Sequence, residues 1–244
     1  MTLIAVMVAP GSTSCTTTCL ALAAATPAQF RPMVVELDCS GGDVAAWAEL
    51  GEQPGWSTAV ASGDRSLAGL VPHVQRLQSG VLTVVAPSRP TEATVVVREA
   101  SARFVPLLAG MSDSVVFADC GRATTDVPHT ATHAAVTIVV VRQHTLSAAV
   151  TVGRIDKATA LVARLRDQGI AIVAVVVGDG PYRPAEIAAH LGVDLVGVLP
   201  DDPTGAIAVI KPPARTALAR AAGPVAAGLM SLVEAPDVSV RVAS

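Results

Sequence analysis

The sequence predicts an α/β protein, a doubly wound and mostly parallel sheet of about seven to eight strands flanked by helices. Apolar runs of strand length, rich in Val and Ile, recur along the 244 residues without polar alternation. Such runs are typical of parallel strands buried on both faces. Stretches with apolar residues at helical spacing lie between them, and this alternation indicates a doubly wound sheet.

The expected strands are residues 3–9, 33–37, 81–86, 115–118, 134–141, 170–177 and 195–199. The expected helices are residues 19–25, 91–109, 147–168, 183–190 and 214–233. Gly169 is the predicted stop signal of the third helix. We expect a single domain over residues 1–233, a flexible tail over 234–244, and a surface excursion over 51–63 that includes Trp56.

The composition argues against several classes of protein, namely nucleic-acid-binding, membrane-spanning and secreted disulfide-rich proteins. The chain is 51% hydrophobic and carries a net charge of −3, so it has no overall attraction for nucleic acid or anionic lipid. No apolar run approaches the roughly 18 residues of a membrane helix. The first run ends at Pro10 with no basic segment before it, so no secretory signal is expected. Four cysteines are too few for a disulfide framework, and a cytoplasmic location is expected.

The segment after the first expected strand has the layout of a phosphate-binding loop. Residues 10–18 (PGSTSCTTT) join an apolar strand to an Ala- and Leu-rich helix. A working loop of this kind needs Gly where the backbone folds around phosphates and Lys to pair with them. Ser14 and Cys15 stand where Gly-Lys would be. A G-x-G-x-x-G pattern is absent from the loop, so dinucleotide binding is not expected, although a small-anion site on a Rossmann-like fold stays an alternative.

Two further strand ends carry polar residues, at 36–43 (ELDCSGGD) and 119–121 (DCG). Ligands of parallel sheets bind at the carboxyl ends of strands, so these segments and the loop belong to one candidate site. In this order, and with residues 192–203 (GVDLVGVLPDDP), they resemble the MinD/ParA-type P-loop ATPases over about residues 3–230. The resemblance implies the fold named above and a switch driven by ATP and Mg²⁺.

The resemblance also implies roles for single residues. The nucleotide-binding positions fall on Gly11, Ser12, Ser14, Cys15, Thr16, Thr17 and Asp119. Thr16 and Asp119 would hold Mg²⁺, and Asp38 would orient the attacking water. Pro10 takes the place of the lysine that reaches across the family's dimer, and Cys15 takes the place of the phosphate lysine. Gly178 falls near the adenine-contacting Asn and cannot make that contact.

These departures weaken a nucleotide site. A hydrogen bond to a charged group contributes about 1.5–3 kcal/mol, so losing both lysines removes several tenfold steps in affinity. Ser14 at a position that requires positive φ adds strain or reshapes the loop. The helix N-terminus at residues 16–18 still attracts an anion weakly. The simplest alternative is that these threonines only cap a helix and that Asp38 and Asp119 only cap loops.

We therefore expect a pseudo-ATPase in which nucleotide binding is lost or weak, with no cofactor unless the loop is functional. It would act as a scaffold or regulatory partner in subcellular positioning, division, pilus or secretion machinery. Its expected partner is a second copy or a related ATPase, because the family pairs face to face over the nucleotide site. The alternative is an enzyme that binds ATP and Mg²⁺ through the variant loop and hydrolyses ATP slowly.

Two other groups of residues are notable. Cys15, Cys39 and Cys120 each follow a strand at the same edge, so their loops are expected to converge; the simplest interpretation is that they are small buried hydrophobes, and the alternative is a soft-metal or redox site. His129 and His133 would share one helix face.

DNA and membrane binding are not expected. The basic candidates are Arg164, Arg166, Lys211, Arg215 and Arg220, a sparse set typical of a solvated face. The C-terminal residues 229–244 lack the basic amphipathic face of a membrane-surface helix.

Overall fold

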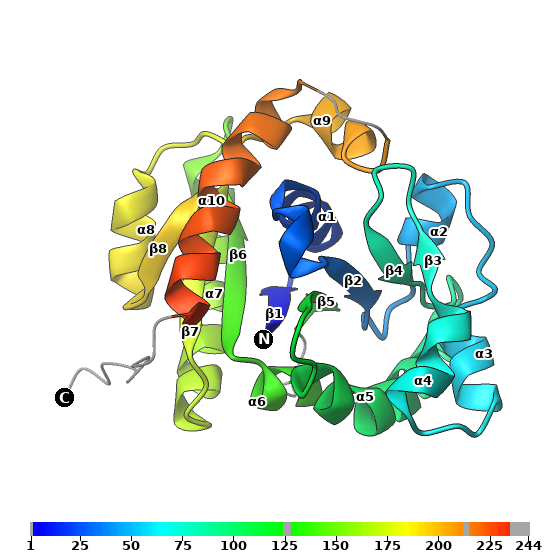
Figure 1. The fold of residues 1–244 in the computed structure, drawn as a ribbon. Helices are drawn as coiled ribbons and strands as arrows, with labels where there is room; N and C mark the ends of the chain where they lie inside the picture. Colours follow the sequence, from blue (N-terminus) through cyan, green and yellow to red (C-terminus); the bar gives the residue numbers. More distant parts are fainter. Residues whose placement is uncertain (1, 124–127, 212–214, 235–244) are drawn as a thin grey trace.

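A computed structural model describes residues 2–123, 128–211 and 215–234. They form an eight-stranded sheet in the order β3-β4-β2-β5-β1-β6-β7-β8, with helices on both faces (Figure 1). The strands are β1 (Thr2–Val8), β2 (Met33–Glu36), β3 (Gln75–Arg76), β4 (Leu82–Val84), β5 (Val115–Arg122), β6 (Val136–Arg142), β7 (Ile172–Val177) and β8 (Asp194–Leu199). The helices are α1 (Cys15–Ala25), α2 (Val44–Trp47), α3 (Trp56–Ala61), α4 (Leu67–Leu70), α5 (Pro90–Ala109), α6 (His129–His133), α7 (Ala148–Asp167), α8 (Pro184–Leu191), α9 (Pro203–Ala208) and α10 (Ala217–Glu234), with short 3₁₀ turns at Ala28–Phe30 and Val71–His73.

The predicted fold class is confirmed. Neighbouring strands from β4 to β8 in the sheet order pair in parallel, and β3 adds to the edge in antiparallel sense. The central strand β1 is buried along its whole length. Its residues alternate between the two core layers, because successive side chains of a strand point to opposite faces. One layer packs under α3, α5, α7 and α8, and the other under α1 and α10.

Some strands and helices are longer than the sequence predicted, mainly because they include polar residues next to their apolar runs. The strand expected over 115–118 runs on to Arg122, which places Asp119 inside β5. Helix α1 begins at Cys15, four residues before the expected start at Cys19, so the threonines lie in its first turn. The helix α7 stops as predicted, with Gly169 at a φ of 70°.

The expectation of a surface excursion over residues 51–63 is wrong for its aromatic residue. Trp56 begins α3 and is fully buried. Its ring centroid lies 5.5 Å from that of Phe104 on α5, and its Nε1 donates to the Glu36 carbonyl oxygen at 2.7 Å. In a core of small aliphatic residues, one large ring fills the space between α3 and α5. The Gly- and Pro-rich flanks concealed this short helix in the sequence.

The C-terminal helix α10 extends through Glu234, the first residue of the expected tail, and residues 235–244 lie outside the described part of the chain. Among the described helices, none is both long enough and apolar enough to cross a membrane.

Candidate functional site

A cavity of about 430 Å³ opens at the carboxyl edge of the sheet, where the candidate site was expected. It lies between the N-terminus of α1 and the residues that follow β2, β5, β6, β7 and β8. Its lining includes Ser12, Thr13, Ser14, Cys15, Thr16, Thr17, Thr18, Asp38, Asp43, Trp47, Arg122, Arg142, Asp201 and Asp202. Gly11 and Asp119 are not part of this lining, while the other predicted site residues are.

The loop has the backbone shape that the sequence predicted. Gly11 has a φ of 83°, and Ser14 has a φ of 83° and a ψ of 16°, which is the left-handed region. Ser14 is the N-cap of α1, and its side chain makes no capping hydrogen bond. A glycine adopts this conformation without strain, whereas a Cβ makes it costly. The strain expected at Ser14 is therefore confirmed.

Cys15 occupies the position where the resemblance expects the phosphate lysine. Its side chain is buried, and its Sγ donates to the Val6 carbonyl oxygen at 3.1 Å. Burial is the largest of the effects that raise the pKa of this thiol well above its usual value. The thiol is therefore neutral at physiological pH, and it supplies no positive charge to the cavity.

Asp119 lies buried near the end of β5 beneath the loop. Its Oδ1 accepts a hydrogen bond from the Gly121 N–H at 3.0 Å. Burial raises the pKa of its carboxyl, while hydrogen bonds from the Cys15 and Thr16 side chains oppose this rise. Thr16 and Asp119, which the resemblance pairs as Mg²⁺ ligands, are therefore neighbours in the structure.

Asp38 follows β2 and faces the cavity. Its Oδ1 accepts the Ser40 N–H at 2.7 Å. A Cβ on Gly121 would lie 1.9 Å from its other carboxylate oxygen, so only glycine permits this close approach of Asp38 to β5. The three predicted strand ends are thus brought together at one edge of the sheet.

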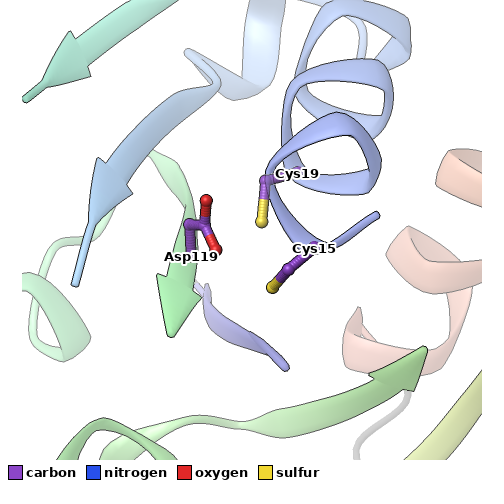
Figure 2. Close-up of side chains that lie close together, drawn as sticks. All are labelled: Cys15, Cys19 and Asp119. Atoms are coloured by element: carbon purple, nitrogen blue, oxygen red, sulfur yellow. The ribbon is translucent and has the colours of Figure 1, made fainter. Parts of the chain in front are cut away.

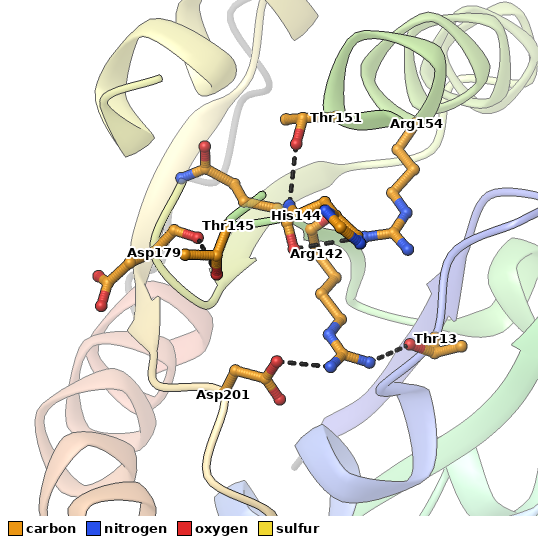
Figure 3. A network of polar contacts seen from close by, with 9 residues as sticks. Thr13, Arg142, His144, Thr145, Thr151, Arg154, Asp179 and Asp201 are labelled. Carbon is orange, nitrogen blue, oxygen red and sulfur yellow. Dashed lines mark hydrogen bonds and ion pairs between the residues drawn. The ribbon is translucent and has the colours of Figure 1, made fainter. Parts of the chain in front are cut away.

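Sequence reasoning missed Arg142, the last residue of β6. Its Nη1 donates to Thr13 Oγ1 at 2.8 Å, and its Nη2 forms an ion pair with Asp201 (Figure 3). Behind it, Arg154 of α7 donates to the Arg142 carbonyl oxygen at 3.0 Å. A basic residue directly after a buried run, at the same edge as the loop, was the signal that could have identified Arg142.

The charges around the cavity do not favour a polyanion. Two arginines face it, Arg122 and Arg142, and Arg142 is already paired. Four aspartates face it as well, namely Asp38, Asp43, Asp201 and Asp202. Lys157 of α7 lies close to the loop although it is not part of the cavity lining, since a Cβ on Gly11 would lie 3.2 Å from its Nζ.

Glu36 is a second residue whose role sequence reasoning missed, although it belongs to the quoted motif. Its buried carboxylate accepts the backbone N–H groups of Asp43 and Val44 at 2.8 Å each, and that of Ala86 at 3.0 Å. Burial raises the pKa of Glu36 to about 7 against the effect of these hydrogen bonds. Glu36 therefore ties the segment that carries Asp38 and Asp43 to the end of β4.

The expected convergence of Cys15, Cys39 and Cys120 is wrong. Cys39 is exposed. Cys120 belongs to the core layer under α5 and α7, whereas Cys15 belongs to the layer under α1 and α10. Cys120 directly follows Asp119 in β5, and adjacent residues of a strand point to opposite faces. Cys19, one turn after Cys15, is the second thiol beside Asp119.

The remaining predicted groups have mixed outcomes. His129 and His133 do share a face of α6, with 3.2 Å between their Nε2 atoms. The basic candidates form no common patch, because Arg166 is on α7 and Arg220 is on α10, and these helices cover opposite faces of the sheet. Gly178 follows β7 with a φ of 77° and has no side chain to offer a base.

Comparison with known proteins supports the fold. No family model and no curated protein matches the sequence. Among solved structures, the chain is similar to the septum site-determining protein MinD from Pyrococcus horikoshii OT3, complexed with Mg-ADP, at 15% identity and a TM-score of 0.72, covering 96% of this chain and 97% of that one. MinD in the MinC:MinD cell division protein complex of Aquifex aeolicus gives 11% identity, a TM-score of 0.69, and 95% and 96% coverage. A ParA family ATPase from Chlorobium tepidum TLS gives 15% identity, a TM-score of 0.69, and 93% and 98% coverage.

Proposed function

We propose that this protein is a pseudo-ATPase of the MinD/ParA type, which binds nucleotide weakly or not at all and acts in the cytoplasm as a scaffold or regulatory partner. The chain has the fold of the MinD/ParA-type P-loop ATPases over nearly its whole length. The process it serves is subcellular positioning, division, or the assembly of a pilus or secretion apparatus. The proposal needs no cofactor.

The observation that carries the proposal is the state of Cys15. A neutral thiol that donates to the Val6 carbonyl replaces the cation expected at this position. Four aspartates and two arginines line the cavity, so a triphosphate would meet net negative charge. Ser14 holds a left-handed conformation that glycine would adopt without strain, so the loop also differs in sequence from a glycine-rich phosphate-binding loop.

The proposed partner is a protein that docks over the cavity face, either a second copy of this chain or a related ATPase. The MinD of the Aquifex aeolicus structure is found in a complex with MinC, which supports a role in protein–protein assembly for this fold. Because the loop has no lysine to pair with the phosphates of a nucleotide, assembly with the partner would not depend on ATP.

Light scattering coupled to gel filtration tests this proposal. The mass of the purified protein should be the same with and without ATP and Mg²⁺ at a given protein concentration. A shift from monomer to dimer on addition of ATP and Mg²⁺ would contradict it.

A slow ATPase is the second candidate, and Arg142 is the observation that favours it. Its guanidinium contacts Thr13 of the loop, so it could supply charge from the side of β6. In this reading Thr16 and Asp119 hold Mg²⁺ and Asp38 orients water. Any phosphate release should then be abolished by Asp38→Ala and unaffected by Glu49→Gln, an exposed substitution away from the cavity.

A further inference from the structure

Two thiols and one carboxylate meet beneath the loop (Figure 2). Cys15 and Cys19 are four residues apart, so their side chains lie on the same face of α1. That face is directed at Asp119 on β5. The two Sγ atoms and a carboxylate oxygen lie within 4.8 Å of one another, and all three residues are buried.

From this cluster we propose that Cys15, Cys19 and Asp119 bind a Zn²⁺ ion. Thiolate sulfur and carboxylate oxygen are both ordinary zinc ligands, at about 2.3 Å and about 2.0–2.2 Å. Donor atoms around a tetrahedral ion of this size are separated by less than 4.8 Å, so the cluster needs only a small contraction to enclose the metal.

Hydrogen bonding within the cluster leaves electron pairs unused. Cys15 has a single S–H proton, and its neighbours include the Val6 carbonyl, the Asp119 carboxylate and the Cys19 sulfur. Asp119 accepts on Oδ1 from Gly121 and has further lone pairs. The Thr16 hydroxyl also donates to this carboxylate, so hydrogen bonds hold the metal-free cluster while lone pairs on its sulfur and oxygen atoms remain available to a cation.

The donor set selects the kind of ion. Mg²⁺ prefers oxygen ligands and retains its waters, so two sulfurs disfavour it. Two thiolates and one carboxylate carry three negative charges, and the buried Glu36 lies on the neighbouring strand. A divalent ion offsets more of this charge than monovalent copper, so the cluster favours Zn²⁺. Binding releases the two thiol protons to solvent as two Zn–S bonds form.

The cluster also has an entry path and a fourth position. Cys15 lines the cavity, while Cys19 and Asp119 lie deeper. An ion can therefore enter from the cavity and take water as its fourth ligand, as zinc does at sites that are not closed by protein. The bound ion would lie under the first turn of α1, at the residue where the lysine is missing.

Cobalt substitution and zinc competition test this site on the full chain after removal of metal under reducing conditions. Co²⁺ should bind at one equivalent and give a thiolate-to-metal charge-transfer band that stoichiometric Zn²⁺ removes. X-ray absorption of the zinc form should show about two sulfur neighbours at about 2.3 Å. Absence of sulfur from the metal's coordination shell would overturn the proposal without any variant.

Single substitutions assign the ligands. Cys15→Ser and Cys19→Ser should each weaken zinc binding by more than about 100-fold, because loss of a ligand costs more than loss of its supporting hydrogen bonds. Cys39→Ser, at the exposed thiol, is the matched control and should bind as the wild type does. Circular dichroism checks that each variant folds, and the alanine variant at the same position replaces any serine variant that does not. Unchanged affinity in both Cys15 and Cys19 variants, or equal loss in Cys39→Ser, would overturn the assignment.

Discussion

At the scale of single residues, the loop between β1 and α1 combines a neutral buried thiol with a strained backbone. The buried Cys15 thiol turns to the backbone of β1, and Ser14 holds a left-handed conformation without a capping bond. Asp119 and Thr16 keep their places below and beside the loop. These placements agree with the proposal that the loop keeps the arrangement of a phosphate-binding loop without its main charge.

Ser14→Gly should raise the free energy of unfolding by about 1 kcal/mol, because glycine relieves the left-handed strain and loses only part of that gain to chain entropy. Urea unfolding of the variant and the wild type measures this change in the free energy of unfolding. Ala24→Gly, an exposed position within α1, introduces the same residue without relieving strain and should lower stability by about 1 kcal/mol. Equal destabilisation by both substitutions would show that Ser14 is unstrained.

Glu36 should make stability depend on pH. Its pKa of about 7 in the folded protein lies above the ordinary value of 4.5, so the folded state binds more protons than the unfolded chain between these values. The free energy of unfolding should therefore fall by about 3 kcal/mol as pH rises from about 4.5 to about 7. Urea unfolding across this range should lose that slope in Glu36→Gln and keep it in Glu49→Gln. A wild-type slope that survives in Glu36→Gln would assign the dependence to another group.

Residue-level prediction from the sequence succeeded where a motif fixed a position and failed where a side chain reached across elements. The loop, Asp38 and Asp119 were found because strand ends of a parallel sheet share an edge. Arg142 was missed because its partners, Thr13 and Asp201, are far from it in the chain. Cys120 was predicted to lie in a loop after the strand. Because β5 continues to Arg122, Cys120 belongs to the strand and its side chain points to the face opposite that of Asp119.

At the scale of elements, α1 and β5 position the site, and the short helix α3 supports it from the side. Trp56 of α3 packs on Phe104 of α5, and its indole also donates to the carbonyl of Glu36. Glu36 in turn holds the backbone at Asp43 and Val44, next to the cavity. These contacts link helix α3, in the segment 51–63 that the sequence predicted to be a surface excursion, to the residues next to the cavity.

Trp56→Ala should therefore lower the free energy of unfolding by about 3–5 kcal/mol, the usual cost of removing a large buried aromatic side chain. Trp47→Ala is the matched control, because Trp47 is 41% exposed at the cavity and should cost far less. Chemical unfolding of both variants gives the comparison. A small cost for Trp56→Ala would mean that α3 is not part of the cooperative core.

The seven long strands and the main helices were predictable from the sequence, because burial on both faces leaves a continuous apolar signal. The two-residue strand β3 and the short helices α2, α4, α6 and α9 were not, since elements this short are too brief for an apolar pattern to repeat. Tertiary contacts, rather than local pattern, decide where these short elements form.

At the scale of the whole molecule, the sheet order places the loop at the centre, with β1 between β5 and β6. This is the fold of MinD- and ParA-type ATPases, and the solved structures match it over nearly the full chain. Such a fold can host a nucleotide site or serve as a docking surface, and the charges at the loop decide between these uses. The neutral thiol and the excess of aspartates are the observations on which the proposed docking role rests.

The most direct measurement is calorimetric titration of ATP and ADP, with Mg²⁺, into the purified wild type and into a variant that carries Cys15→Lys with Ser14→Gly. We predict no binding heat, or only binding much weaker than micromolar, for the wild type, whatever the variant does, since Cys15 supplies no cation at the loop. Micromolar binding by the wild type would contradict the account, and loss of that binding in Arg142→Ala would identify the group that replaces the lysine.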